Sequence, residues 1–165
     1  MKIKNKNYST LWIENNKIKI IDQTKLPFEL KIKELNTIND FCRAITEMEV
    51  RGAPLIGVTA AFGLASSLRK DASFRNIDKS VDALLKTRPT AVNLRWALDY
   101  ILQKIKNKRI QDRADLSFEL AKKLRQDDII NCFKIGLNGY KLIEKMYKKK
   151  KKPINILTHC NAGWL

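Results

Sequence analysis

Apolar and polar residues alternate along the first 35 residues, with the period of two that half-buried strands show. The alternating apolar positions fall in three runs: Leu11 and Ile13, Ile18 and Ile20, and Leu30 and Ile32. Asn15 and Asn16 separate the first two runs and favour a hairpin turn. Residues 1–36 are therefore predicted to form a small antiparallel β-sheet.

From Thr37 the apolar spacing changes to three and four residues, the period of an amphipathic helix. Thr37 is placed to cap a helix that carries Ile38, Phe41, Ile45 and Met48. The segment Pro54–Leu68 is apolar on nearly every face, so we expect it to be buried in the middle of a bundle. Residues 37–152 are predicted to complete the bundle with helices at about 76–86, 91–107, 112–126 and 127–149.

Five consecutive lysines, Lys148–Lys152, precede Pro153 and indicate a solvated helix end. The short apolar run Ile154–Thr158 that follows suits a buried strand. One strand without partners can neither bury its faces nor satisfy its backbone. We therefore expect residues 153–165 to be the first strand and loop of a second, truncated domain. A fragment or an interrupted reading frame would produce such a chain.

Composition excludes several classes of protein. The chain has 165 residues, of which 44% are hydrophobic and 30% charged, as in globular domains. It has no apolar run near 18 residues, so we expect no membrane span. Its three cysteines are an odd number without metal-ligand spacing, which argues against disulfides and a zinc site. A reduced, cytoplasmic setting is therefore expected.

The formal net charge of +16 suggests nucleic-acid binding, but its distribution argues against that. Residues 101–152 hold 16 basic and 6 acidic side chains, and the two signs are mixed rather than separated into a basic stripe. Lysine, isoleucine and asparagine all have A/T-rich codons, so genome composition accounts for much of the excess. We expect no nucleic-acid partner.

Two arginines stand before predicted helix starts, where exposed N–H groups and the helix dipole favour an anion. Arg51 precedes Gly52, Ala53 and Pro54, and it predicts a phosphate or carboxylate site that includes the backbone of Gly52 and Ala53. The alternative is an ordinary turn with a surface arginine.

Arg88 stands before a second predicted helix start, where Thr90 is a suitable cap. Two such arginines would converge on one phosphate, because each guanidinium has a planar fork that matches it. Alternatively, Asn93 and Trp96 in this segment only pack, with Trp96 buried.

Cys160 follows the apolar run 154–158 within Leu157–Gly163. Ligands of open α/β sheets bind in the loops beyond the carboxyl ends of strands, so Cys160 is a candidate nucleophile, acid/base or hydrogen-bond donor. The alternative is a buried structural thiol. His159, the one histidine, has neither triad partners nor enough neighbours for a metal site.

Taken together, these segments resemble the methylthioribose-1-phosphate isomerase family. That family is related to archaeal ribose-1,5-bisphosphate isomerases and to regulatory subunits of translation initiation factor 2B. The resemblance runs from Leu11 to Leu165 and keeps order and spacing in these segments: Ile21–Pro27, Met48–Gly57, Ala60–Gly63, Arg88–Leu94 and Leu157–Gly163. Leu55, Phe62 and Trp164 are modest departures from it.

The resemblance implies an α+β N-terminal domain followed by the first strand of a Rossmann-like α/β domain. It also implies conversion of 5-methylthioribose 1-phosphate, a small sugar phosphate, to 5-methylthioribulose 1-phosphate in methionine salvage. No metal or organic cofactor is implied, and the full-length protein is expected to be a homodimer. Arg51, Gly52, Ala53 and Arg88 match substrate-binding positions, and Cys160 matches the catalytic cysteine.

The family's acid/base aspartate belongs to the second domain, so the 165-residue chain alone is expected to be inactive. Two alternative functions remain open: a non-catalytic regulatory subunit of the initiation factor 2B type, and a ribose-1,5-bisphosphate isomerase. The segment around Cys160 and the early Asp22–Pro27 segment favour the isomerase branch.

Overall fold

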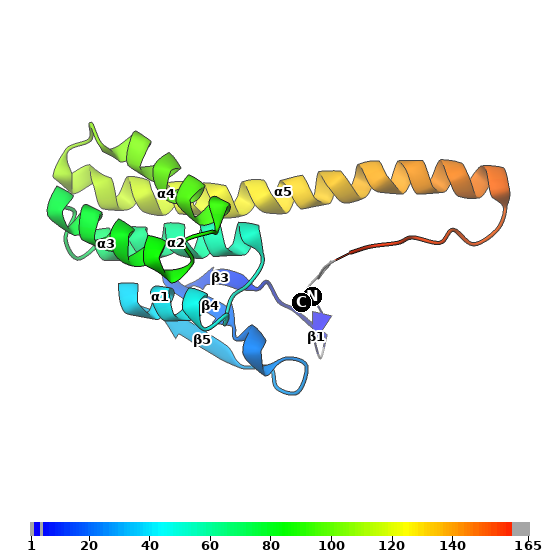
Figure 1. The fold of residues 1–165 in the computed structure, drawn as a ribbon, viewed down its shortest axis with the longest axis horizontal. Helices are drawn as coiled ribbons and strands as arrows, with labels where there is room; N and C mark the ends of the chain where they lie inside the picture. Colours follow the sequence, from blue (N-terminus) through cyan, green and yellow to red (C-terminus); the bar gives the residue numbers. More distant parts are fainter. Residues whose placement is uncertain (1, 4, 160–165) are drawn as a thin grey trace. The chain divides into compact units, whose positions relative to one another are not determined.

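The computed structural model describes residues 2, 3 and 5–159, and it divides into two compact units, Met1–Arg125 and Gln126–Leu165. The first unit combines small antiparallel sheets with helices, as expected (Figure 1). The elements follow in this order: β1 (Lys2–Ile3), β2 (Lys6–Asn7), β3 (Leu11–Glu14), β4 (Lys17–Ile21), the 3₁₀ helix η1 (Gln23–Lys25), β5 (Ile32–Leu35), α1 (Ile38–Thr46), α2 (Ala53–Leu68), α3 (Phe74–Thr87), α4 (Val92–Ile105) and α5 (Ile110–Lys150).

The predicted sheet is confirmed: β3, β4 and β5 form a three-stranded antiparallel sheet in that order, while β1 and β2 form a separate ladder. Asn15 and Asn16 have φ angles of 51° and 61°, which a two-residue primed turn requires and which asparagine tolerates. The turn sets the register in which buried Leu11 pairs with buried Ile20. The third strand begins at Ile32, so Leu30 lies outside it.

Helix α1 begins as predicted, with Thr37 as its N-cap. The Thr37 hydroxyl accepts from the Asp40 N–H, and the Asp40 carboxylate accepts from the Thr37 N–H at 2.9 Å, which completes a capping box. The helix ends at Thr46, so Met48 is not part of it. The Val50 N–H donates to the Ala44 carbonyl at 3.1 Å, because the chain turns back there.

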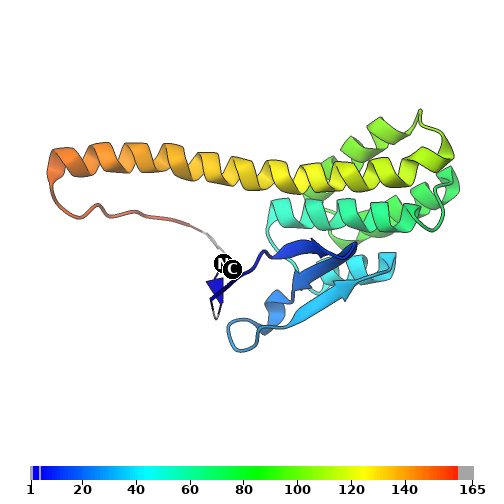
Figure 2. The ribbon, with the colours of Figure 1, turned by 180° about the vertical axis from the view of Figure 1, so that it is seen from behind.

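Helix α2 is the buried centre of the first unit, as its all-round apolar pattern predicts. Nearly every residue from Ile56 to Leu68 is buried. Figures 1 and 2 show α2 between the three-stranded sheet with α1 on one side and α4 with the first part of α5 on the other. The ring of Phe62 packs edge-to-face on Phe118 of α5, with ring centroids 5.6 Å apart.

Two glycines of α2 allow neighbouring helices to approach closely. A Cβ at Gly57 would lie 2.7 Å from the Asn93 carbonyl oxygen of α4, which is closer than real Cβ atoms come. A Cβ at Gly63 would lie 2.9 Å from the Cβ of Phe41 on α1. The distance of α2 from both neighbours therefore depends on the absence of a side chain at these positions.

The two helices predicted at 112–126 and 127–149 are one continuous helix, α5. The boundary predicted at 126–127 lies in Gln126–Asp128, which contains neither proline nor glycine, so backbone hydrogen bonding continues through it. Within the first unit, the Arg125 guanidinium donates to the Leu11 carbonyl at 2.8 Å and to the Ser9 hydroxyl at 3.1 Å. This pairing attaches α5 to the sheet.

In the second unit, α5 ends at Lys150 within the lysine run, as expected. The buried strand expected at Ile154–Thr158 is not formed: described residues 151–159 contain neither helix nor strand, and Leu157 is 99% exposed. The segment pairs with none of the described strands, so it lacks the ladder that would make it a strand. No helix in the described part of the chain is long and apolar enough to cross a bilayer.

A buried ionic cluster joins the sheet to the loop that precedes α2. Asp22 follows β4 and Glu49 precedes α2, and each is 1% exposed. The Lys33 ammonium on β5 lies 2.9 Å from Asp22 Oδ2 and 2.6 Å from Glu49 Oε1. Burial by itself raises the pKa of Asp22, but hydrogen bonds from Thr24 and Lys33 outweigh it and hold that pKa below its usual value.

We expect Gly57→Ala to destabilise the first unit by about 1–3 kcal/mol, because the added methyl group meets backbone atoms that cannot rotate away. The free energy of unfolding from urea titration measures the effect. Gly136→Ala is the matched control, since a Cβ there meets no described atom and alanine favours the helix. A Gly57→Ala variant as stable as this control would contradict the close approach.

We expect Asp22→Asn to lower the free energy of unfolding by about 1–3 kcal/mol near neutral pH. A carboxyl whose pKa is lowered by folding stabilises the fold above its unfolded pKa of about 3.9, and that stabilisation is lost as pH falls through the folded pKa. The difference from wild type should therefore shrink below about pH 4. Urea unfolding across this range measures it, with Asp82→Asn, on an exposed ion pair with Lys86, as control. A difference that does not change with pH would count against the cluster.

Candidate functional site

The segment before α2 holds Arg51 at an open helix start. Gly52 is the N-cap residue, with a φ of 95° that favours glycine, and no side chain caps the helix. Helix α2 begins at Ala53, so Pro54 is its second residue rather than its first. Gly52 and Ala53 are exposed and Arg51 is half-buried. An uncapped helix start with an adjacent guanidinium is suited to an anion such as phosphate.

The Arg51 side chain has one partner among the described residues. Its Nε donates to Oε1 of Gln23 at 3.2 Å. This leaves both terminal nitrogens of the guanidinium for a ligand, and these are the donors that bind a phosphate in bidentate fashion.

Arg88 lies between α3 and α4 and is half-buried. No described residue pairs with its guanidinium. The predicted cap, Thr90, is one position too early: Ala91 is the N-cap of α4 and provides no side-chain hydrogen bond. The Ala91 N–H donates to the Arg88 carbonyl at 3.0 Å, and this turn shifts the helix start beyond Thr90.

The starts of α2 and α4 lie side by side. A Cβ at Gly57, near the start of α2, would lie 2.7 Å from the Asn93 carbonyl oxygen and 3.5 Å from the Ala97 Cβ, both near the start of α4. Figure 1 shows both helices beginning at the same end of the first unit. The structure therefore places the Arg51–Ala53 and Arg88–Ala91 segments before two adjacent, uncapped helix starts. Two cationic segments at one end of the unit are suited to one anionic ligand.

A hollow of about 310 Å³ begins next to Arg88. These residues line it: Pro89, Thr90, Ala91, Val92, Arg95, Trp96 and Asp99. Trp96 is 57% exposed and stacks on Tyr100 with centroids 6.0 Å apart, so the interpretation of Trp96 as a buried packing residue is wrong. Helix α4 buries Leu94 and Leu98, and Trp96 lies on the opposite side. The hollow gives an apolar surface beside the candidate phosphate site.

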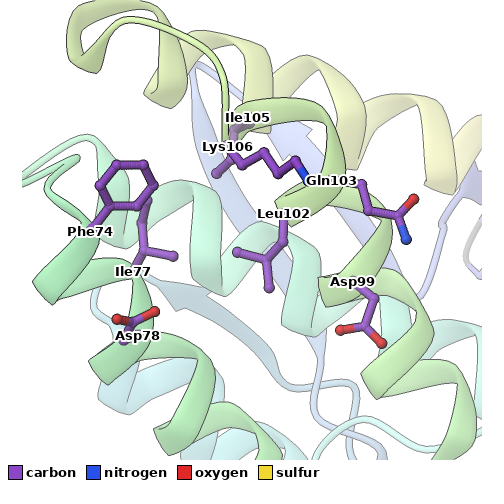
Figure 3. Close-up of a pocket in the computed structure, with 8 residues that line it drawn as sticks. All are labelled: Phe74, Ile77, Asp78, Asp99, Leu102, Gln103, Ile105 and Lys106. Carbon is purple, nitrogen blue, oxygen red and sulfur yellow. The ribbon is translucent and has the colours of Figure 1, made fainter.

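A second hollow, of about 360 Å³, lies between α3 and α4 and contains none of the predicted site residues. Figure 3 shows Asp78 on α3 and Asp99 on α4 at its walls, with Leu102 between them. Among the described residues, no three His, Cys, Asp or Glu side chains are grouped to hold a metal ion.

Cys160 lies outside the described residues, so its predicted catalytic role stays a prediction. His159 is described and exposed, and it belongs to the second unit.

Sequence reasoning missed Gln23 as part of the site. The residue lies within the Ile21–Pro27 segment on which the resemblance was based, but no role followed from its type or spacing. Two polar residues, Asp22 and Gln23, directly after a buried strand were the available signal, because buried polar side chains require partners.

A profile of the Initiation factor 2 subunit family matches residues 49–165. Methylthioribose-1-phosphate isomerases from Escherichia coli O45:K1 and Methylorubrum populi are 44% and 46% identical to this chain. In both, the alignment covers 100% of this chain but 46% of the relative, so the chain spans about half the length of these relatives.

Two solved structures share the fold. The delta subunit of translation initiation factor eIF-2B from A. fulgidus has a TM-score of 0.66 at 31% identity, covering 73% of this chain and 37% of that one. The 5-methylthioribose 1-phosphate isomerase from Pyrococcus horikoshii has a TM-score of 0.65 at 32% identity, covering 72% and 36%. The architecture and the family profile together establish that the chain belongs to the Initiation factor 2 subunit family, and it is similar to methylthioribose-1-phosphate isomerases.

Proposed function

We propose that this chain provides the phosphate-binding half of a 5-methylthioribose-1-phosphate isomerase of methionine salvage. The observation that carries the proposal is the pair of arginines before adjacent, uncapped helix starts. Identities of 44% and 46% to isomerases from two organisms, over the whole of this chain and about half of each relative, favour this substrate over other phosphorylated sugars. The homodimer expected of the full-length protein stays a prediction.

In this proposal, Arg51 and Arg88 hold the phosphate, and the N–H of Ala53 at the start of α2 adds a further donor. The substrate's phosphate occupies the anomeric oxygen, so the simple ring opening of free aldoses is blocked. The site must orient the sugar while the ring opens and a hydrogen moves from C2 to C1, and a fixed phosphate provides that orientation. Cys160 would donate or accept a hydrogen bond or a proton at the reacting carbons.

The acid/base aspartate would lie in the remaining part of the isomerase relatives, outside the 46% of their length that aligns with this chain. The 165-residue chain would then bind the sugar phosphate without converting it, since the two roles lie in different halves of the protein.

The main alternative is a non-catalytic subunit of the initiation factor 2B type. It is favoured by the likeness to the delta subunit from A. fulgidus, whose TM-score equals that of the isomerase within 0.01. The isomerase is preferred because relatives of that name match the whole chain. Binding of the sugar phosphate separates the two functions.

We expect Arg51→Ala and Arg88→Ala each to weaken binding of 5-methylthioribose 1-phosphate by about 10- to 100-fold, because each removes charge-assisted hydrogen bonds to phosphate. Isothermal titration calorimetry measures the dissociation constants. Arg75→Ala is the matched control, because it removes the same charge at the other end of α3 from Arg88. Arg75 lies near the start of that helix, and Arg88 follows its last residue. Equal affinities for all three variants and wild type would refute the assignment, and ribose 1,5-bisphosphate as a competitor tests the sister activity.

We expect the purified 165-residue chain to show no turnover of 5-methylthioribose 1-phosphate above the uncatalysed rate, even where binding is saturated. Appearance of the ketose product, followed by NMR, measures it. A rate that scales with chain concentration would show that the chain carries a complete site and would overturn the half-site proposal.

A further inference from the structure

We propose that Gln23 is a positioning residue for Arg51, holding its guanidinium so that the terminal nitrogens face the ligand's phosphate. The inference rests on the proposed function, in which Arg51 binds that phosphate.

Gln23 is itself firmly held. It is the first residue of η1, directly after Asp22, and it is 7% exposed. Its N–H donates to the Glu49 carbonyl at 2.9 Å, and its Oε1 accepts from Arg51 Nε at 3.2 Å. One residue thus contacts both the backbone and the side chain of the loop that carries Arg51.

The Arg51 nitrogen that donates to Gln23 determines which guanidinium donors remain for a ligand. Because Nε is occupied by Gln23, the plane of the guanidinium is fixed and its two terminal nitrogens form the free edge. Fixing the side chain before the ligand arrives lowers the entropy cost of binding. The neutral amide of Gln23 fixes the guanidinium without cancelling its positive charge, whereas a carboxylate at this position would compete with the phosphate for Arg51.

The backbone on both sides of this contact is also fixed. Lys33 bridges Asp22, next to Gln23, and Glu49, two residues before Arg51. Val50, next to Arg51, is fully buried and donates its N–H to the Ala44 carbonyl. Gln23 and Arg51 therefore meet on two segments that other contacts hold together, and loss of the Gln23 amide should release the arginine more than the backbone.

The test reads Arg51 directly, through the Nε–H signal of arginine side chains in a ¹⁵N NMR spectrum, assigned with Arg51→Lys. In wild type this proton should exchange with solvent more slowly than that of exposed Arg75. Gln23→Met keeps length and burial but removes the acceptor. It should speed the exchange and weaken binding of 5-methylthioribose 1-phosphate roughly 5- to 30-fold. Gln111→Met, at an exposed position on α5, is the control and should change neither.

Gln23→Glu separates positioning from a purely structural role. Its carboxylate can accept from Arg51 Nε, so slow exchange should return, while its negative charge should keep binding weaker than in wild type. Unchanged exchange and affinity in Gln23→Met would overturn the inference. If that variant does not fold, Gln23→Glu decides through the exchange rate: slow exchange of the Arg51 Nε–H supports the inference, and exchange as fast as that of exposed Arg75 overturns it. Absent binding in wild type would instead overturn the proposed function, and the exchange data would still show whether Gln23 holds Arg51.

Discussion

Burial of α2 on all its faces is the constraint from which the rest of the first unit follows. A helix that is apolar all round must be surrounded, so the sheet, α1, α3, α4 and the first part of α5 all pack around it. Only its ends remain available for a ligand. At its start, Gly52 provides no side-chain cap, and the free N–H groups there are the natural position for an anion.

The site is therefore positioned by helix packing rather than by loop sequence. Because Gly57 has no side chain, the backbone of α4 approaches α2 more closely than a methyl group at position 57 would allow. This close approach brings the start of α4 beside the start of α2. The ionic cluster of Asp22, Lys33 and Glu49 then fixes the loop before α2 to the edge of the sheet. Both carboxylates of the cluster are buried, and each forms an ion pair with Lys33.

Much of the fold followed from local signals. The asparagine turn, the capping box of Thr37 and the all-round apolar pattern of α2 each depend on neighbouring residues, and each prediction was confirmed. Two of the errors were local in origin. Helix α5 continues where two helices were predicted, because the segment at 126–128 holds neither proline nor glycine, and the start of α4 was misplaced because a turn at Arg88 shifts it. The partnership of Gln23 with Arg51 spans 28 residues, and no local pattern encodes it.

The same packing explains why fold alone does not separate an isomerase from an initiation-factor subunit. The packing of the helices depends on Gly57, Gly63 and the residues around α2, and any protein with this architecture requires such packing. Both solved neighbours share the architecture almost equally. The candidate site of this chain consists of a few polar side chains at one end of the unit. The net charge of +16 contributes little to this distinction, since most of it lies in residues 101–152 and not before the helix starts. In the proposed site both arginines stand before helix starts, and Arg51 keeps its terminal nitrogens free, so their placement is a property of the fold around them.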